Sequence, residues 1–136
     1  MYDIIVYLNA IYGVSKDLHY TAHGESFYSL HLMYDKIAED LLDYADEIKE
    51  NYYMAREFKM PTAKEINAST IEYMSSMSDI HELHNLITLC IYHIEEYVNN
   101  NGILTEGDKS LLGEISNDLN KKLGFINQTI KNKAEI

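Results

Sequence analysis

Apolar residues recur at intervals of three and four along nearly the whole chain, the spacing that places side chains on one face of an α-helix. The first such run spans residues 2–23 and is followed by Gly24, a residue type that commonly follows a helix end. A second run begins after the sequence HGES and continues to about residue 58, before the only proline, Pro61. The pattern therefore predicts a helix over 2–23, a second long helix over about 26–58, and a connection over 59–70.

The second half of the chain contains one short and two long helical patterns. The short pattern covers residues 69–77, and a long one covers 79–100, where the triplet NNN and Gly102 favour a left-handed cap. The last helix is expected to begin between Thr105 and Asp108, and no segment alternates as a strand does. We therefore predict an all-α, ferritin-like four-helix bundle, with a short extra helix in the crossover between helices two and three.

Length and composition favour a single soluble domain over residues 1–136. With 136 residues and 46% hydrophobic residues, the chain lies in the ordinary range for one globular domain. No apolar run approaches the ~20 residues that a membrane span requires. The N-terminal sequence MYDIIVYLNA lacks the basic segment of a secretory signal, so a cytoplasmic location is expected. The single cysteine, Cys90, lies in an apolar run and is expected to be a buried hydrophobic residue.

The charge balance favours cations as partners. Twenty-two acidic residues against eleven lysines and arginines give a formal net charge of −11. Such a charge repels nucleic-acid phosphates and attracts metal ions. The alternative is that the acidic surface only keeps a helical protein soluble.

Two pairs of potential metal ligands lie in the second predicted helix. His31 with Asp35 and Asp46 with Glu50 are each four residues apart, which places each pair on one helix face. Imidazole and carboxylate groups together suit iron or manganese. The midpoints of the pairs, residues 33 and 48, are fifteen residues apart, or ~22 Å along a helix. A second subunit crossing antiparallel near residue 40 would bring each pair against the other pair of its partner.

The stretch LHYTAHGESFYSLHLMYDKIAEDLLDYADEIKE, residues 18–50, resembles the signature of the Dps proteins, the miniferritins that protect DNA during starvation. The five ligand positions of that signature are matched by His19, His31, Asp35, Asp46 and Glu50. The resemblance implies a ferroxidase site that lies between two-fold related subunits. It also implies a hollow homo-oligomer, a dodecamer, which oxidises ferrous iron with hydrogen peroxide or dioxygen and stores the ferric mineral.

The neighbours of the matched ligands depart from the family pattern. Tyr20 stands where the family usually has tryptophan, and Lys49 and Asn51 flank Glu50 in place of the usual A-E-R. The Gly-Gly turn that often follows the second helix is also missing from the sequence. The five ligand positions thus match the family pattern, but the residues around them do not. Subunit contacts that depend on the Gly-Gly turn are also expected to differ from those of the family.

An entry route for iron is expected at the start of the last helix. Glu106, Asp108 and Glu114 fall where the family tends to line its three-fold pores with carboxylates, which concentrate cations. The alternative is that acids at a helix N-terminus only complement the helix dipole. The other histidines, His23, His81, His84 and His93, are interpreted as helix-end, helix-surface or packed residues.

Two other functions are alternatives to iron oxidation. Dps relatives often compact DNA through a lysine-rich tail, but here only Lys16 precedes residue 36. The C-terminal helix carries four further lysines with Glu135 beside them: Lys121, Lys122, Lys131 and Lys133. That patch is too small to overcome the net charge, so DNA binding is not expected. The third possibility, a helical shell without chemistry, conflicts with the five intact ligand positions.

Overall fold

The computed structural model describes the backbone of residues 1–135 and the side chains of residues 1–131. All regular structure in the described chain is helical, as the apolar periodicity predicted. The elements are α1 (Tyr2–Thr21), α2 (Phe27–Ala38), α3 (Leu41–Ile48), the π-helix η1 (Lys49–Met54), α4 (Ala63–Tyr73), α5 (Ile80–Asn100) and α6 (Glu106–Glu135).

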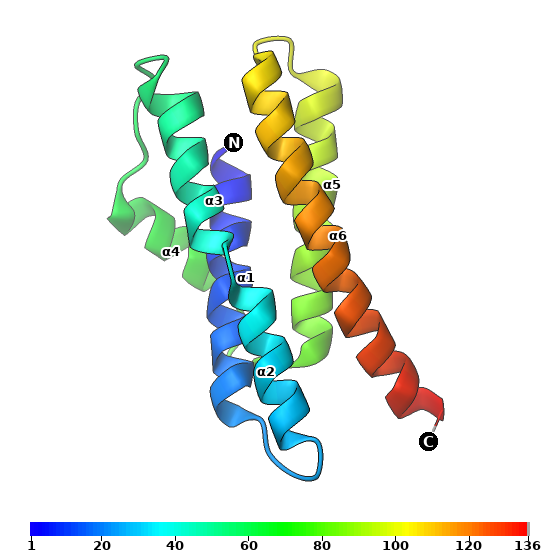
Figure 1. Ribbon diagram of the computed structural model, residues 1–136. Coiled ribbons are helices and arrows are strands. Elements are labelled where there is room, and N and C mark those ends of the chain that lie inside the picture. The colour runs from blue at the N-terminus through cyan, green and yellow to red at the C-terminus, as the bar shows by residue number, and fades with distance from the viewer. Residues whose placement is uncertain (136) are drawn as a thin grey trace.

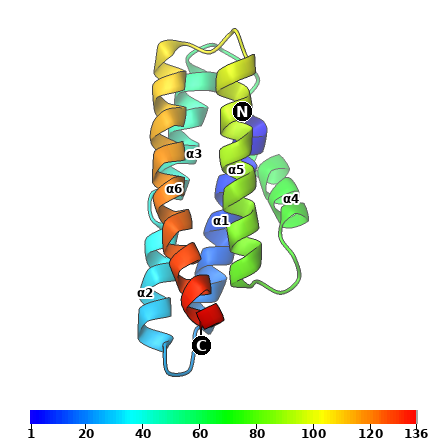
Figure 2. The ribbon, with the colours of Figure 1, turned by 90° about the vertical axis from the view of Figure 1, so that its right-hand side faces the viewer.

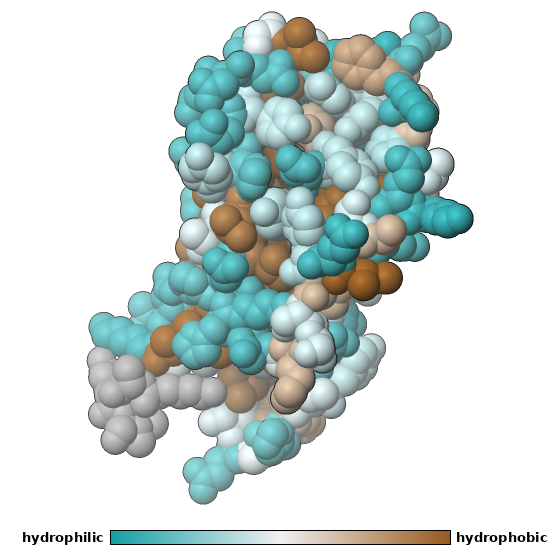
Figure 3. Space-filling model, turned by 180° about the vertical axis from the view of Figure 1, so that it is seen from behind, coloured by the Kyte–Doolittle hydropathy of each residue, from teal (hydrophilic) through white to brown (hydrophobic). Residues whose placement is uncertain are grey.

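Helix α1 is the element around which the others pack. It contacts α2, α3, α4 and α5, while α5 packs along α6 (Figure 1). Helices α2 and α3 follow one another end to end along α1, and the short α4 lies on the side of the molecule away from α6 (Figure 2). Seen from behind, hydrophilic side chains cover most of the surface, with apolar ones showing between them (Figure 3). No helix in the described chain is both long enough and apolar enough to cross a membrane.

The core is built mainly from aliphatic side chains on the inward faces of the long helices. Fully buried members from each long helix are Ile4, Ile5, Leu8, Ile11, Ile37, Leu41, Ile48, Leu83, Ile87, Ile94, Leu112 and Ile115. Each such side chain stabilises the fold by about 1.5–3 kcal/mol relative to exposure, before conformational entropy is counted. Cys90 is fully buried in the same core, and burial raises the pKa of its thiol, as expected for a structural rather than a reactive cysteine.

The prediction of one continuous helix over about 26–58 was wrong. Helix α2 ends at Ala38 and α3 begins at Leu41, because Glu39 has ψ 142° and Asp40 adopts a left-handed conformation with φ 67°. From Lys49 to Met54 the chain then continues as a π-helix. Neither glycine nor proline marks the break between α2 and α3, and the left-handed residue is an aspartate, a type that tolerates this conformation better than most.

Two smaller predictions also need correction. The short helix spans Ala63–Tyr73 rather than 69–77, because Thr62 and Glu65 form a reciprocal capping box just after Pro61. The expected left-handed cap after α5 is not formed, since Asn101 has φ −113° and ψ 103°. Gly24, which was expected to follow the first helix, has a positive φ of 87° in the turn between α1 and α2.

Candidate metal centre

The two histidines of the predicted site lie against each other where α1 ends and α2 begins. The rings of His19 and His31 are stacked, with centroids 3.6 Å apart and an interplanar angle of 20°. Each Nδ1 lies 2.7 Å from the backbone carbonyl oxygen of the other histidine. Because a carbonyl oxygen can only accept, both Nδ1 atoms must carry the proton and donate. In the neutral form of such a ring, the lone pair is on Nε2, and this is the form in which histidine binds a metal ion.

Aromatic side chains hold this histidine pair from both sides. Phe27 stacks on His31 with ring centroids 5.1 Å apart, and Tyr20 meets His19 edge-on at 5.0 Å. Tyr20, at the position where the Dps signature usually has tryptophan, is 72% exposed. In the described chain, neither Nε2 atom of the stacked pair has a hydrogen-bond partner that would occupy its lone pair.

Asp35 lies one helical turn after His31 and is held by Lys16 of α1. The Lys16 Nζ donates to Asp35 Oδ1 at 2.9 Å. The hydrogen bond from Lys16 holds the pKa of Asp35 below its usual value, and the nearby His19 and His31 act in the same direction. Asp35 is therefore a carboxylate at neutral pH, and a cation that binds it through Oδ1 competes with the Lys16 ammonium group.

Asp46 and Glu50 form a separate, exposed pair one turn apart on α3 and η1. In the described part of the chain, no hydrogen bond or ion pair joins either carboxylate to the histidine pair. Glu50 lies in the π-helix, where its carbonyl accepts from the Ala55 amide five residues on, at 3.0 Å. The wide π turn follows Glu50, whereas Ile48 and Lys49, between Asp46 and Glu50, have ordinary α-helical dihedral angles.

The five predicted ligands thus fall into two groups within one chain. The first half-site is His19, His31 and Asp35, and the second half-site is Asp46 and Glu50. Over the described residues, no three histidine, cysteine or acidic side chains are arranged so that they hold a metal ion within a single chain. A complete site would require ligands from more than one chain or a rearrangement of Asp35.

The three acids proposed to line an entry pore have different surroundings. Glu106 and Glu114 are exposed, whereas Asp108 is only 1% exposed. Asp108 accepts from the Thr105 amide at 3.0 Å, and the Thr105 hydroxyl accepts from the Asp108 amide at 3.1 Å. Asp108 therefore caps α6 and is not available to line a pore, whereas Glu106 and Glu114 are still available.

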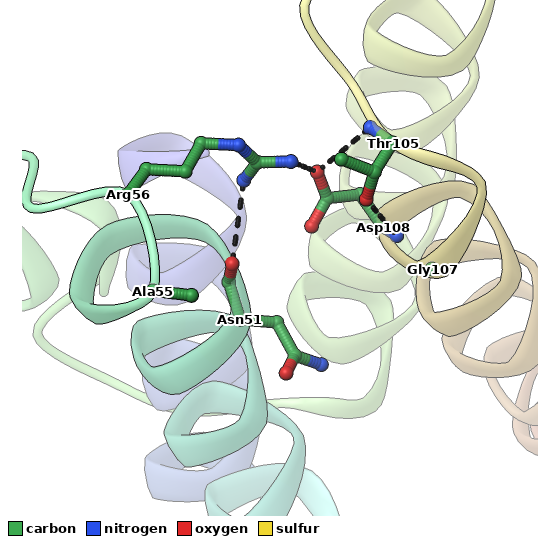
Figure 4. A pocket seen from close by; sticks show the side chains of 6 residues that line it. All are labelled: Asn51, Ala55, Arg56, Thr105, Gly107 and Asp108. Atoms are coloured by element: carbon green, nitrogen blue, oxygen red, sulfur yellow. Dashed lines mark hydrogen bonds and ion pairs between the residues drawn. The ribbon is translucent and has the colours of Figure 1, made fainter.

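Asp108 also forms an ion pair with Arg56, which the sequence did not indicate (Figure 4). Burial alone would raise the pKa of Asp108, but the hydrogen bonds from Arg56 and Thr105 outweigh it and lower that pKa. Arg56 also donates to the carbonyl oxygens of Asn51 and Tyr52, each at 3.3 Å. Arg56 therefore ties the end of the π-helix to the start of α6, beside a cavity of about 360 Å³.

Fewer lysines of the C-terminal helix are exposed at the surface than the sequence suggested. Lys122 is buried, whereas Lys121 and Lys131 are exposed. The side chains of Lys133 and Glu135 lie outside the described residues. A buried lysine cannot contact a phosphate, so the basic patch loses one of its expected members.

Of the other histidines, His93 is packed as expected. Its ring lies 5.1 Å from that of Tyr7, with the Tyr7 hydroxyl 3.4 Å from its Nε2.

No protein-family model matches the chain, and neither does any curated protein sequence. A proposal for its function therefore rests on the side chains described above and on the resemblance of residues 18–50 to the Dps signature.

Proposed function

We propose that this chain is a subunit of a ferritin-like assembly of the miniferritin type, which oxidises ferrous iron and stores the ferric product. In this proposal α1, the α2–α3 segment, α5 and α6 are the four helices of the bundle. The short α4 then belongs to the crossover between the second and third helices. The order and lengths of the elements support this assignment, as does the resemblance of residues 18–50 to the Dps signature.

The observation that carries the proposal is the stacked pair of His19 and His31. Their mutual Nδ1 hydrogen bonds leave both Nε2 atoms without a hydrogen-bond partner, on stacked rings near the ionised Asp35. Fixing the tautomer by a backbone acceptor is how proteins prepare histidine to bind a metal. In the proposed site, ferrous iron is the substrate, and Asp46 and Glu50 of a two-fold related subunit complete its ligands.

The ligand types suit the proposed reaction. Neutral imidazole and carboxylate oxygens bind iron, and anionic carboxylates stabilise the ferric ion more than the ferrous ion. Two ferrous ions give one electron each to hydrogen peroxide, which takes up two protons and becomes two water molecules. With dioxygen as the oxidant, four ferrous ions and four protons give two water molecules.

The proposed assembly is a closed homo-oligomer, with the dodecamer as the expected size. The formal net charge of −11 would attract ferrous ions to such a shell and disfavour DNA. Exposed Glu106 and Glu114 would line its iron-entry pores. Because each site needs a second chain, assembly and activity are linked in this proposal.

The direct test measures iron oxidation after ferrous iron is added without oxygen and peroxide is then supplied. We expect the wild-type protein to oxidise iron at least about tenfold faster than His31→Ala, since removing a ligand weakens the site. His81→Ala, which changes an exposed histidine on α5, is the matched control and should match wild type. Equal rates for His31→Ala and wild type would overturn the proposed site, and a monomeric mass in solution would overturn the shell.

A further inference from the structure

The break between α2 and α3 depends on more than helix propensity. The segment KIAEDLLD, residues 36–43, contains neither glycine nor proline and is rich in residues that favour helices. The backbone places Asp40 at φ 67°, a left-handed conformation that costs energy for residues other than glycine, although aspartate adopts it more readily than most. A strained residue of this kind persists only where surrounding structure holds it.

Lys122 of α6 is the side chain that holds the break. It is only 4% exposed, and its Nζ donates to the carbonyl oxygen of Glu39 at 2.6 Å. The same Nζ forms an ion pair with Asp118 Oδ2 at 2.8 Å. Ending a helix leaves its last carbonyls without amide partners, and Lys122 supplies a donor to one of them. The partner comes from 83 residues away in the sequence, which is why local propensity did not reveal it.

The break lies midway between the two half-sites. His31 and Asp35 precede it on α2, and Asp46 and Glu50 follow it on α3 and η1. The angle at Glu39 and Asp40 therefore sets the direction of one half-site relative to the other. In a two-fold pair, each chain contributes both halves, so a change in this angle would misalign both sites at once.

We propose that Lys122 is a positioning residue of the shared metal site, which acts by fixing the angle between α2 and α3 through the Glu39 carbonyl. This inference rests on the proposed function. Lys122 lies outside the set of ligands and acts only on the backbone between them. Its role is to pre-align the first half-site of each chain with the second half-site of its partner.

The test compares cobalt binding by Lys122→Met with that by Lys121→Met, a matched control on the exposed neighbour. Co²⁺ takes nitrogen and oxygen ligands like those of ferrous iron, and its visible spectrum reports ligand geometry. We expect Lys122→Met to keep the helical circular dichroism but to bind Co²⁺ at least about tenfold more weakly, with an altered spectrum. Lys121→Met should bind as wild type does.

A second substitution separates positioning from general stability. Adding Asp40→Gly to Lys122→Met should restore part of the cobalt affinity, because glycine adopts a positive φ without strain. If Lys122→Met does not fold, Lys122→Arg replaces it and should bind Co²⁺ about threefold or more weakly, because the guanidinium cannot place its donors where Nζ lies. Wild-type affinity and spectrum in the folded Lys122 variant would overturn the positioning role.

The same measurements distinguish a failure of the inference from a failure of the proposed function. If wild-type protein binds no Co²⁺, or binds it equally well after His31→Ala, the shared site itself is wrong and the positioning role falls with it. If wild-type binding depends on His31 but not on Lys122, the site stands and only the positioning role is overturned.

Discussion

His19 and His31 each donate a hydrogen bond from Nδ1 to the backbone carbonyl of the other, at 2.7 Å in both directions, with their rings stacked 3.6 Å apart. This reciprocal contact joins the last turn of α1 to α2 across the turn that contains Gly24. It fixes both ring orientations and both tautomers before any ligand arrives. Such pre-organisation lowers the cost of assembling a metal site.

The first prediction concerns which chains supply the ligands. A variant with His31→Ala and Asp35→Ala keeps the second half-site, and one with Asp46→Ala and Glu50→Ala keeps the first. Each alone should oxidise iron slowly. After dissociation and reassembly of an equal mixture, random pairing gives one intact site in half of the dimers, so about a quarter of the wild-type activity should return.

This experiment needs proof that the two variants share assemblies. Native mass spectrometry of differently tagged chains provides it, and each variant reassembled alone is the control. If mixed assemblies form and no activity returns, the ligands must be gathered within one chain.

The second prediction concerns the competition between Lys16 and an incoming cation at Asp35. Lys16→Met removes the ammonium group 2.9 Å from the carboxylate, so Co²⁺ affinity at pH 7 should rise by about two- to fivefold. The pKa of Asp35 should also move up towards its ordinary value, because the hydrogen bond that lowers it is lost. NMR titration of the Asp35 carboxyl measures this change.

Lys36→Met is the matched control for Lys16→Met. It removes one positive charge from the residue next to Asp35, but the Lys36 ammonium lies against Glu39 instead, at 3.7 Å. An equal rise in cobalt affinity for both variants would show that total charge, rather than displacement of Lys16, is responsible.

The third prediction concerns the ion pair between Arg56 and Asp108. Arg56→Met leaves a buried carboxylate without its partner, and we expect it to lower the free energy of unfolding by about 3 kcal/mol. Urea unfolding at pH 7 measures the loss. Glu106→Gln, which removes the exposed pair with Lys109, should cost less than about 1 kcal/mol.

The pH dependence of that loss follows from the lowered pKa of Asp108. A carboxyl whose pKa is lower in the folded state stabilises the fold above its unfolded pKa, about 4, and this contribution is lost as pH falls through the folded value. The difference between Arg56→Met and wild type should therefore be largest at neutral pH and shrink below about pH 4. A difference that does not change with pH would mean that Arg56 acts through packing alone.

Much of the fold and part of the candidate site could be predicted from local spacing. Apolar residues such as Ile4, Leu8 and Ile11 repeat with the helical period, so the existence of the long helices followed from the sequence alone. The spacing of four residues between His31 and Asp35, and between Asp46 and Glu50, likewise placed each pair on one helix face. These features depend only on neighbours within one or two turns.

The tertiary structure decided whatever depends on partners distant in the chain. At the break, Lys122, 83 residues away, donates to the Glu39 carbonyl, and the cap of α6 is joined to Arg56, 52 residues away. Asp40 tolerates the left-handed conformation of the break, but the donor for the Glu39 carbonyl comes only from the distant helix. The buried Lys122 ammonium group needs an acceptor, and the Glu39 carbonyl needs a donor. The two groups meet only when α6 packs against the break. The local sequence thus determined which side chains share a helix face, and packing between helices determined that His19 meets His31 and how α2 is oriented relative to α3.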